Sequence, residues 1–238
     1  MKTITAPADN PELELAEQFV LYTDTNLFLT GRAGTGKTTF LKHIREVCPK
    51  RHIVTAPTGV AAINAGGVTL HSFFQIPFGP FVPGSDGYNH SMQNRFSREK
   101  QNIIRSLDLL IIDEISMVRA DVLDAVDSVL KRFRRNNKPF GGVQLLMIGD
   151  LQQLTPVVKE SDRPLLAQFY QTPYFFSSKG LEDAPLQTIE LQRIYRQTDS
   201  HFISLLNKVR ENRLVEESLQ ALNTRLQPGF QAPEGFIT

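Results

Sequence analysis

A glycine-broken stretch, Gly31 to Thr38 (GRAGTGKT), could do the clearest chemistry in the sequence. It matches the phosphate-loop pattern G-x-x-x-x-G-K-[ST], and it lies between a strand-like and a helical segment, as that motif requires. The glycines let backbone N–H groups point at phosphate oxygens, and the following helix presents its positive end to the same anion. We expect Lys37 to reach the β- and γ-phosphates and Thr38 to bind Mg²⁺. The residues predicted to bind the nucleotide in this loop are Gly34, Thr35, Gly36, Lys37, Thr38 and Thr39.

Two adjacent carboxylates could complete such a site. Asp113 and Glu114 directly follow the apolar run Leu109 to Ile112, and ligands collect at the carboxyl ends of strands in open α/β sheets. We expect Asp113 to bind the magnesium and Glu114 to orient or deprotonate the attacking water. An Asp-Glu pair after a strand is often only a helix N-cap. Its combination with a phosphate loop favours the catalytic interpretation.

The elements that must position these residues follow a repeated order of strands and helices. Apolar runs alternate with helical periodicity, which indicates an α/β fold with a mostly parallel sheet covered by helices on both faces. A helix is also expected before the first strand, over Leu13 to Tyr22, and apolar stripes predict helices after the phosphate loop and over Val122 to Phe133. The predicted central strands are Asn26 to Thr30, His52 to Ala56, Leu109 to Ile112 and Gln144 to Ile148.

Composition limits the class of protein. The 238 residues suffice for one large domain or for a domain and part of another. No apolar run approaches the roughly 20 residues of a membrane helix, and Cys48 is the single cysteine, so we expect a soluble intracellular protein with one buried thiol. The net charge of +1 provides no global attraction for nucleic acid, and any such site must be local.

The densest basic run, residues 131–135, favours the solvated end of a helix over a nucleic-acid patch. Lys131 and Arg134 continue a polar stripe begun by Asp124 and Asp127, and basic residues complement the dipole at a helix C-terminus.

Several nucleotide hydrolases combine a phosphate loop with an acidic strand end, so other features must distinguish them. GTPases recognise guanine through the motif N-K-x-D. The most similar stretch of this sequence, residues 137–140, has Phe140 where the motif needs Asp. Loader-type ATPases place a polar sensor, often Asn, at the end of the next strand, where this chain has Gly149 and Asp150. A loader-type, DNA-associated ATPase switch remains the alternative to a motor.

A longer ordered set of motifs resembles the Pif/RecD branch of superfamily-one DNA helicases, most closely the Pif-type enzymes. These motifs are Gln18, GRAGTGKTT, TAPTGVAAINAGGVTLHSFF, LLIIDEISMV, PFGGVQLLMIGDLQQL and ELQRIYRQ. They extend over about residues 11 to 210. The resemblance implies a RecA-like ATPase that couples ATP hydrolysis to 5′-to-3′ movement on single-stranded DNA, with ATP and Mg²⁺ as cofactors.

The resemblance also implies roles for residues outside the phosphate loop. Gln18 resembles the glutamine that reads the adenine edge, and Gln153 the glutamine that senses the γ-phosphate and couples it to DNA. Arg196 resembles the arginine that reaches the γ-phosphate from the second motor domain, with Arg193 as the competing candidate. The catalytic residues expected are therefore Lys37, Glu114, Gln153 and Arg196.

The block Thr55 to Phe74 resembles the DNA-facing motifs of the family. Hydroxyl, backbone and imidazole groups in it can contact phosphates, and a phenylalanine ring, Phe73 or preferably Phe74, can stack on an unpaired base. Such contacts predict sequence-tolerant, salt-dependent binding of single strands. The residues expected to contact DNA are Thr58, Gly59, Val60, Ala61, His71, Ser72 and Phe74.

We expect an N-terminal helix over residues 1–24 and a first RecA-like domain over 25–180, with a long loop or insertion at 75–97. Residues 181–238 are expected to be a linking segment and the truncated start of a second RecA-like domain, which would make the chain a fragment that does not unwind duplexes alone. Thr155 departs from the proline usual in the family. A monomer acting on single strands and fork-like duplexes is expected, in the cytoplasm or nucleoid, or in the nucleus or mitochondria of a eukaryote. A domain that binds without catalysis is a further alternative, which intact Lys37, Asp113 and Glu114 disfavour.

Overall fold

The computed structural model describes residues 10–86, 88, 96–195, 199–224, 226 and 229. Contacts divide the chain into two compact units, Met1–Ile194 and Tyr195–Thr238. Within the described residues, the structure contains no helix that is both long and apolar enough to span a membrane.

The first unit is built on a six-stranded sheet in which every pair of neighbouring strands is parallel. The strands are β1 (Asn26–Gly31), β2 (His52–Ala56), β3 (Val68–Thr69), β4 (Leu109–Ile112), β5 (Gln144–Gly149) and β6 (Leu186–Leu191). Their order in the sheet is β3-β2-β4-β5-β1-β6. The four predicted central strands are confirmed, with β1 and β5 each extended by a glycine, whereas the two edge strands β3 and β6 were not predicted.

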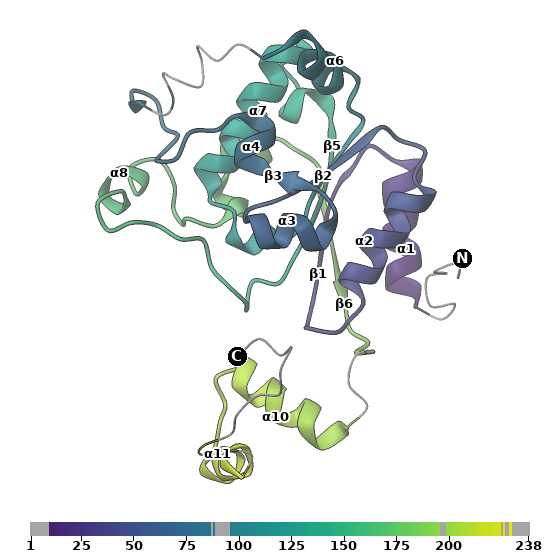
Figure 1. Cartoon of the computed structure of the whole chain (residues 1–238), viewed down its shortest axis with the longest axis vertical. Coiled ribbons are helices and arrows are strands. Elements are labelled where there is room, and N and C mark those ends of the chain that lie inside the picture. The colour runs from purple at the N-terminus through teal and green to yellow at the C-terminus, as the bar shows by residue number, and fades with distance from the viewer. Residues whose placement is uncertain are drawn as a thin grey trace. The chain divides into compact units, whose positions relative to one another are not determined.

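Helices cover both faces of the sheet, as the sequence predicts (Figure 1). On one face lie α1 (Pro11–Tyr22) and α2 (Lys37–Val47), and on the other lie α4 (Leu70–Phe74), α6 (Arg98–Ser106) and α7 (Ala120–Arg134). The central strands are buried on both faces, so alternate residues feed two separate apolar clusters. In β4, for example, Leu109 and Ile111 join the cluster under α1 and α2, whereas Leu110 and Ile112 join the cluster under α7.

Shorter helices make up most of the remaining regular structure of the first unit. The α-helices are α3 (Gly59–Ala65), α8 (Arg163–Leu166) and α9 (Lys179–Glu182), and the 3-10 helices are Ile115–Met117, Pro139–Gly142 and Phe175–Ser177.

Helix α7 carries three aspartates that each hold a different segment of the chain. Asp121 accepts a hydrogen bond from the Phe81 backbone N–H (2.8 Å), and Asp127 accepts one from Phe140 N–H (2.6 Å). Asp124 accepts bonds from the Tyr170 hydroxyl (2.8 Å) and the Gly180 N–H (3.0 Å). Hydrogen bonds to a charged carboxylate are stronger than bonds between neutral groups. The three aspartates therefore fix to α7 segments that lie far apart in the sequence.

Two basic side chains at the C-terminal end of α7 bind groups within the protein. Arg134 donates to the carbonyls of Ile104, Arg105 and Leu107 at 2.7–3.0 Å, and so closes the C-terminal end of α6. Lys131 pairs with Asp127 at 2.7 Å. The sequence interpretation of a solvated helix end is therefore wrong for these two side chains, because their partners lie on the helix itself and on α6.

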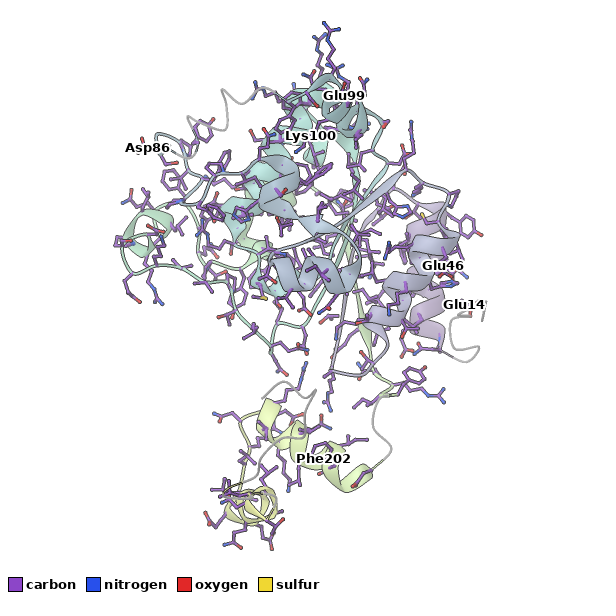
Figure 2. All side chains as sticks on the ribbon, in the orientation of Figure 1. Glu14, Glu46, Asp86, Glu99, Lys100 and Phe202 are labelled. Carbon is purple, nitrogen blue, oxygen red and sulfur yellow. The ribbon has the colours of Figure 1, made fainter. Side chains whose placement is uncertain are left out.

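Part of the predicted loop at 75–97 contributes to the core. Residues 87 and 89–95 lie outside the described residues, but Phe81 and Phe96 are 5% exposed and join the α7 cluster. The ammonium of Lys100, on α6, lies 4.9 Å from the centre of the Phe96 ring and 5.3 Å from that of Phe73 (Figure 2). Phe81 and Phe96 of this loop are thus packed into the core that α6 and α7 share.

The first unit continues past residue 180, the end that the sequence predicts, because β6 pairs with β1 over its whole length. The second unit contains α10 (Ser200–Arg210) and α11 (Glu216–Asn223). Asp199 caps α10 by accepting from the Phe202 N–H (3.1 Å), and Lys208 donates to the Ser218 hydroxyl (3.0 Å) to join the two helices.

Candidate nucleotide and nucleic-acid site

The phosphate loop connects the carboxyl end of β1 to the first residue of α2. Gly34 has φ +82° and Gly36 has φ +98°, a left-handed conformation that costs glycine little and other residues much more. Gly36 is the N-cap of α2 and Lys37 is its first residue. The loop therefore delivers the chain directly into the positive end of an eleven-residue helix.

Internal hydrogen bonds set the shape of the loop. The Thr35 hydroxyl is buried and donates to the Arg32 carbonyl (2.9 Å). The Lys37 ammonium donates to the carbonyls of Gly31 (2.5 Å) and Arg32 (3.0 Å). Thr38 and Thr39, in the first turn of α2, are exposed. An anion in the loop would thus meet Lys37 already held over the loop and the Thr38 hydroxyl open to a metal ion.

Asp113 and Glu114 lie at the carboxyl end of β4, which is separated from the phosphate-loop strand by β5 alone. The Asp113 N–H donates to the Thr55 carbonyl of β2 (2.9 Å), which continues the ladder past the end of β4. Glu114 has φ +52°, and its N–H donates to the Asp113 carboxylate (3.0 Å). A non-glycine residue held at positive φ is strained, and such residues gather at functional sites.

Nearby charges, including that of the loop lysine, act on the pKa values of both carboxylates. Burial raises the pKa of Asp113, and the charge of Lys37 opposes that rise. Burial is also the first cause that raises the pKa of Glu114, followed by the charge of Asp113, while Asp150 adds to the rise and Lys37 reduces it. The charges of Lys37, Asp113 and Asp150 therefore all influence the pKa of Glu114.

Asp150, at the end of β5, is the site residue that the sequence analysis did not select. It is 1% exposed, and it accepts from the side chain of Gln153 (2.8 Å) and from the Gln152 N–H (3.1 Å). The exposed Gln153 is therefore held by a buried carboxylate. The available signal was an acid directly after a fully buried strand, the same pattern that identified Asp113.

Gln18 is exposed on α1, on the side opposite the buried Leu13, Ala16 and Val20. Its neighbour Glu17 contacts His43 of α2 at 3.1 Å, and His43 lies six residues, about 9 Å at 1.5 Å per residue, beyond the phosphate-loop end of that helix. The adenine contact of Gln18 stays a prediction. Arg196 lies outside the described residues.

The predicted DNA contacts lie at the carboxyl ends of β2 and β3, on the same edge of the sheet. Thr58 caps α3 by accepting from the Ala61 N–H (3.2 Å). Gly59, Val60 and Ser72 are exposed, and Ala61 and His71 are half-buried. Phe74 is 0% exposed and belongs to the α7 core cluster. The prediction that Phe74 stacks on a base is wrong, because its ring is enclosed by the protein.

The oxygen donors at this edge fit magnesium. No group of three or more His, Cys, Asp or Glu that could hold a metal alone occurs in the described ranges. Mg²⁺ usually takes only one or two protein oxygens and completes its shell with phosphate and water. The Asp113 carboxylate and the exposed Thr38 hydroxyl are donors of that kind.

Comparison with known proteins agrees with this arrangement. A family model described as "PIF1-like helicase" matches residues 14–219. The chain belongs to the PIF1-like helicase family. The ATP-dependent DNA helicase PIF1 of Homo sapiens is 38% identical over 226 residues, which are 93% of this chain and 33% of the human protein. The Candida albicans enzyme of the same name is 38% identical over 220 residues, 89% of this chain and 24% of its own.

Solved PIF1 structures share the fold. A Bacteroides Pif1 helicase in complex with ADP-AlF3 and single-stranded DNA superimposes with a TM-score of 0.88 at 41% identity, covering 99% of this chain and 52% of that one. A second structure of Bacteroides Pif1 bound to single-stranded DNA gives 0.89, again at 41% identity, and covers 98% and 53%. The sheet and helices are therefore a RecA-like PIF1 domain, and the chain spans about half of those solved chains and less of the curated relatives.

Proposed function

We propose that this chain carries the site at which ATP binds with Mg²⁺ at the phosphate loop, and that hydrolysis at this site drives the whole protein along single-stranded DNA. The observation that carries the proposal is the convergence of Lys37, Asp113, Glu114 and Asp150 at the ends of three adjacent strands. In this proposal the phosphate loop, the metal donors and a candidate base act on the same bound phosphate. Phosphoryl transfer to water requires all three.

Each residue has a role in this proposal. Lys37 would leave its loop carbonyls for the β- and γ-phosphates, and Thr38 and Asp113 would hold a magnesium ion, which would supply positive charge beside the phosphates. Glu114, with its pKa raised by burial and by Asp113, takes a proton from the attacking water more readily than an exposed carboxylate would. Gly34, Thr35, Gly36 and Thr39 shape the cradle.

Gln153 is proposed to report the state of the γ-phosphate to the DNA-facing edge. Its amide is held by Asp150, whose charge also acts on Glu114, so hydrolysis at one end of the pair and movement at the other are linked through one buried carboxylate. Gln18 is proposed to contact adenine and Arg196 to stabilise the transition state, on the strength of the sequence resemblance.

For the whole protein we propose an ATP-dependent DNA helicase with 5′-to-3′ polarity, acting on single strands and fork-like duplexes. Of the predicted segment 181–238, the part up to Ile194 belongs to the first unit, and the part that follows it would link to, and begin, a second RecA-like domain. A monomer is proposed as the working form; one solved relative is described as two coordinating Pif1 helicases at forked DNA. We place the protein wherever the cell keeps its DNA: cytoplasm or nucleoid, or nucleus or mitochondria.

The test is ATP hydrolysis by the full-length protein with and without single-stranded DNA. We expect stimulation by the DNA and loss of hydrolysis in Lys37→Ala. Nucleotide-dependent oligomers without DNA stimulation would instead identify a loader-type switch. DNA binding with no hydrolysis under either condition would identify a binding module.

A further inference from the structure

One phenylalanine on the DNA-facing side of the first unit is almost wholly exposed. Phe78 is 91% exposed. One face of its ring stacks on the imidazole of His71, with ring centres 5.2 Å apart and an interplanar angle of 17°. Single exposed apolar residues are common on protein surfaces, so exposure alone assigns no role to Phe78. The backbone that carries the ring gives the second observation.

The chain next to Phe78 is clamped to the start of α7. Arg119 donates to the Gly79 carbonyl (2.7 Å) and, through two nitrogens, to both oxygens of Asp121 (2.8 and 2.7 Å). Asp121, itself 1% exposed, also accepts from the Phe81 N–H (2.8 Å). A bidentate, buried pair of this kind fixes geometry as well as energy. The exposed ring is therefore carried by a backbone held at the following residues.

Phe78 and His71 also line a pocket of about 360 Å³, together with Thr58, Gly79 and Arg119. The charges around it largely offset one another, because Arg119 is paired with Asp121, and Lys159 and Asp162 both line the wall. Burial, and then the charge of Arg119, lower the pKa of His71 against the opposing effect of Asp121. A flat and largely uncharged aromatic wall thus stands beside Thr58.

We propose that the open face of the Phe78 ring receives an unpaired nucleobase of single-stranded nucleic acid, so that base, Phe78 and His71 form one stack. This inference rests on the proposed function, namely that the chain binds single-stranded DNA. A neutral aromatic wall suits a base better than a phosphate, and stacking tolerates any base because every base has a π-face. The site replaces the stacking role that the sequence suggested for Phe74.

The experiment measures binding of a fluorescein-labelled dT oligonucleotide, and of a strand of equal length made of abasic deoxyribose phosphate, by fluorescence anisotropy. It uses the complete protein and the variants Phe78→Ala and Phe78→Trp. Stacking on one aromatic side chain corresponds to roughly a 5- to 160-fold change in affinity. We expect Phe78→Ala to weaken dT binding by that factor, Phe78→Trp to retain it, and neither to change abasic binding.

Phe176→Ala provides the matched control. Phe176 is also an exposed phenylalanine, 48% exposed and stacked on Tyr174, but it does not line the pocket. It should leave dT binding unchanged. Binding of a fluorescent ADP analogue and the thermal midpoint should be the same in all variants, which separates a lost stack from a lost fold.

The outcomes separate this inference from the function beneath it. If Phe78→Ala binds dT as the unsubstituted protein does, the stack is disproved while single-strand binding stands. Equal weakening of dT and abasic binding would also overturn it, since the ring would then act on the backbone or on the loop. No binding of dT by the unsubstituted protein would overturn both the DNA-binding part of the proposed function and this inference.

Discussion

The proposed nucleotide site and the proposed nucleic-acid site are held by different kinds of interaction. The phosphate loop is shaped within a few residues of itself: Thr35 and Lys37 both bond to carbonyls at most six positions away. The Phe78 segment is shaped by Arg119 and Asp121, forty positions further along the chain. The phosphate loop is thus shaped locally, whereas the Phe78 segment takes its shape only when Arg119 and Asp121 are in place beside it.

The largest effect expected of a single substitution is on the rate of ATP hydrolysis, at the proposed nucleotide site. Glu114→Gln keeps the shape of the side chain and removes the proton acceptor. We expect the rate of ATP hydrolysis to fall by about 10²- to 10⁴-fold, the usual contribution of general acid–base catalysis, while nucleotide binding is retained. Steady-state phosphate release with single-stranded DNA present measures the first, and titration with a fluorescent ADP analogue measures the second.

Unchanged hydrolysis in Glu114→Gln would remove Glu114 from the role of base. Glu46→Gln is a suitable control, because Glu46 is exposed on α2 (Figure 2) and should leave the rate unaltered.

At the proposed nucleic-acid site the largest expected effect is on stability. Asp121→Ala removes a buried acceptor and leaves the side chain of Arg119, only 14% exposed, without its ion-pair partner. Breaking a buried pair in this way costs about 3–5 kcal/mol of the free energy of unfolding. Urea unfolding measures that loss, and in low denaturant binding of dT should weaken while the loop near Lys37 still binds nucleotide.

Asp86→Ala is the comparison variant, since Asp86 is an exposed carboxylate on the same loop segment (Figure 2). It should change stability little. If Asp121→Ala proved equally mild, the Phe78 segment would not depend on the clamp, and the contrast between the two sites would be lost.

The same contrast explains what could be predicted from the sequence. The central strands are predicted to within one residue because they are buried on both faces and read as continuous apolar runs. The phosphate loop and Asp113 are found by spacing alone. The edge strands were missed because β3 has two residues and β6 has only two buried positions.

Long-range partners account for the errors. The sequence predicts that Asp124 and Asp127 lie on a polar stripe, but their partners in the fold lie 46 to 56 and 13 positions away, respectively. Phe74 and Phe78 are alike in type, and only the packing of α4 against α7 decides that Phe74 is enclosed and Phe78 exposed. Periodicity cannot give that distinction for a five-residue helix.

A smaller effect is expected where catalysis and stability oppose each other. The pKa of Glu114 lies above its ordinary value of 4.5 because of burial and the charge of Asp113. The protonated form therefore stabilises the fold below that value, and this contribution is lost as pH rises through the higher folded-state pKa. At neutral pH, Glu114→Gln should raise the free energy of unfolding by roughly 0.5–2 kcal/mol, the range of such single stabilising substitutions.

The measurement is the thermal midpoint at pH 7.5 and at pH 4, in EDTA and without nucleotide. The variant should melt higher than the unsubstituted protein at pH 7.5 and close to it at pH 4. A lower midpoint at pH 7.5 would mean that the Glu114 carboxylate is favourably paired in the fold.

The smallest expected effect concerns Ser116, in the 3-10 helix Ile115–Met117 that directly follows Glu114. Its hydroxyl is the one buried side-chain polar atom, among the residues that the structure describes, without a hydrogen-bond partner. An unpaired buried donor costs free energy, and Ser116→Ala should raise the free energy of unfolding by about 1 kcal/mol. Ser178→Ala makes the same change at a buried serine whose hydroxyl donates to Asp124, and it should lower stability by a similar or larger amount. Urea midpoints of the two variants measure the difference. An equal loss of stability in both variants would mean that the Ser116 hydroxyl has a hydrogen-bond partner in the folded protein.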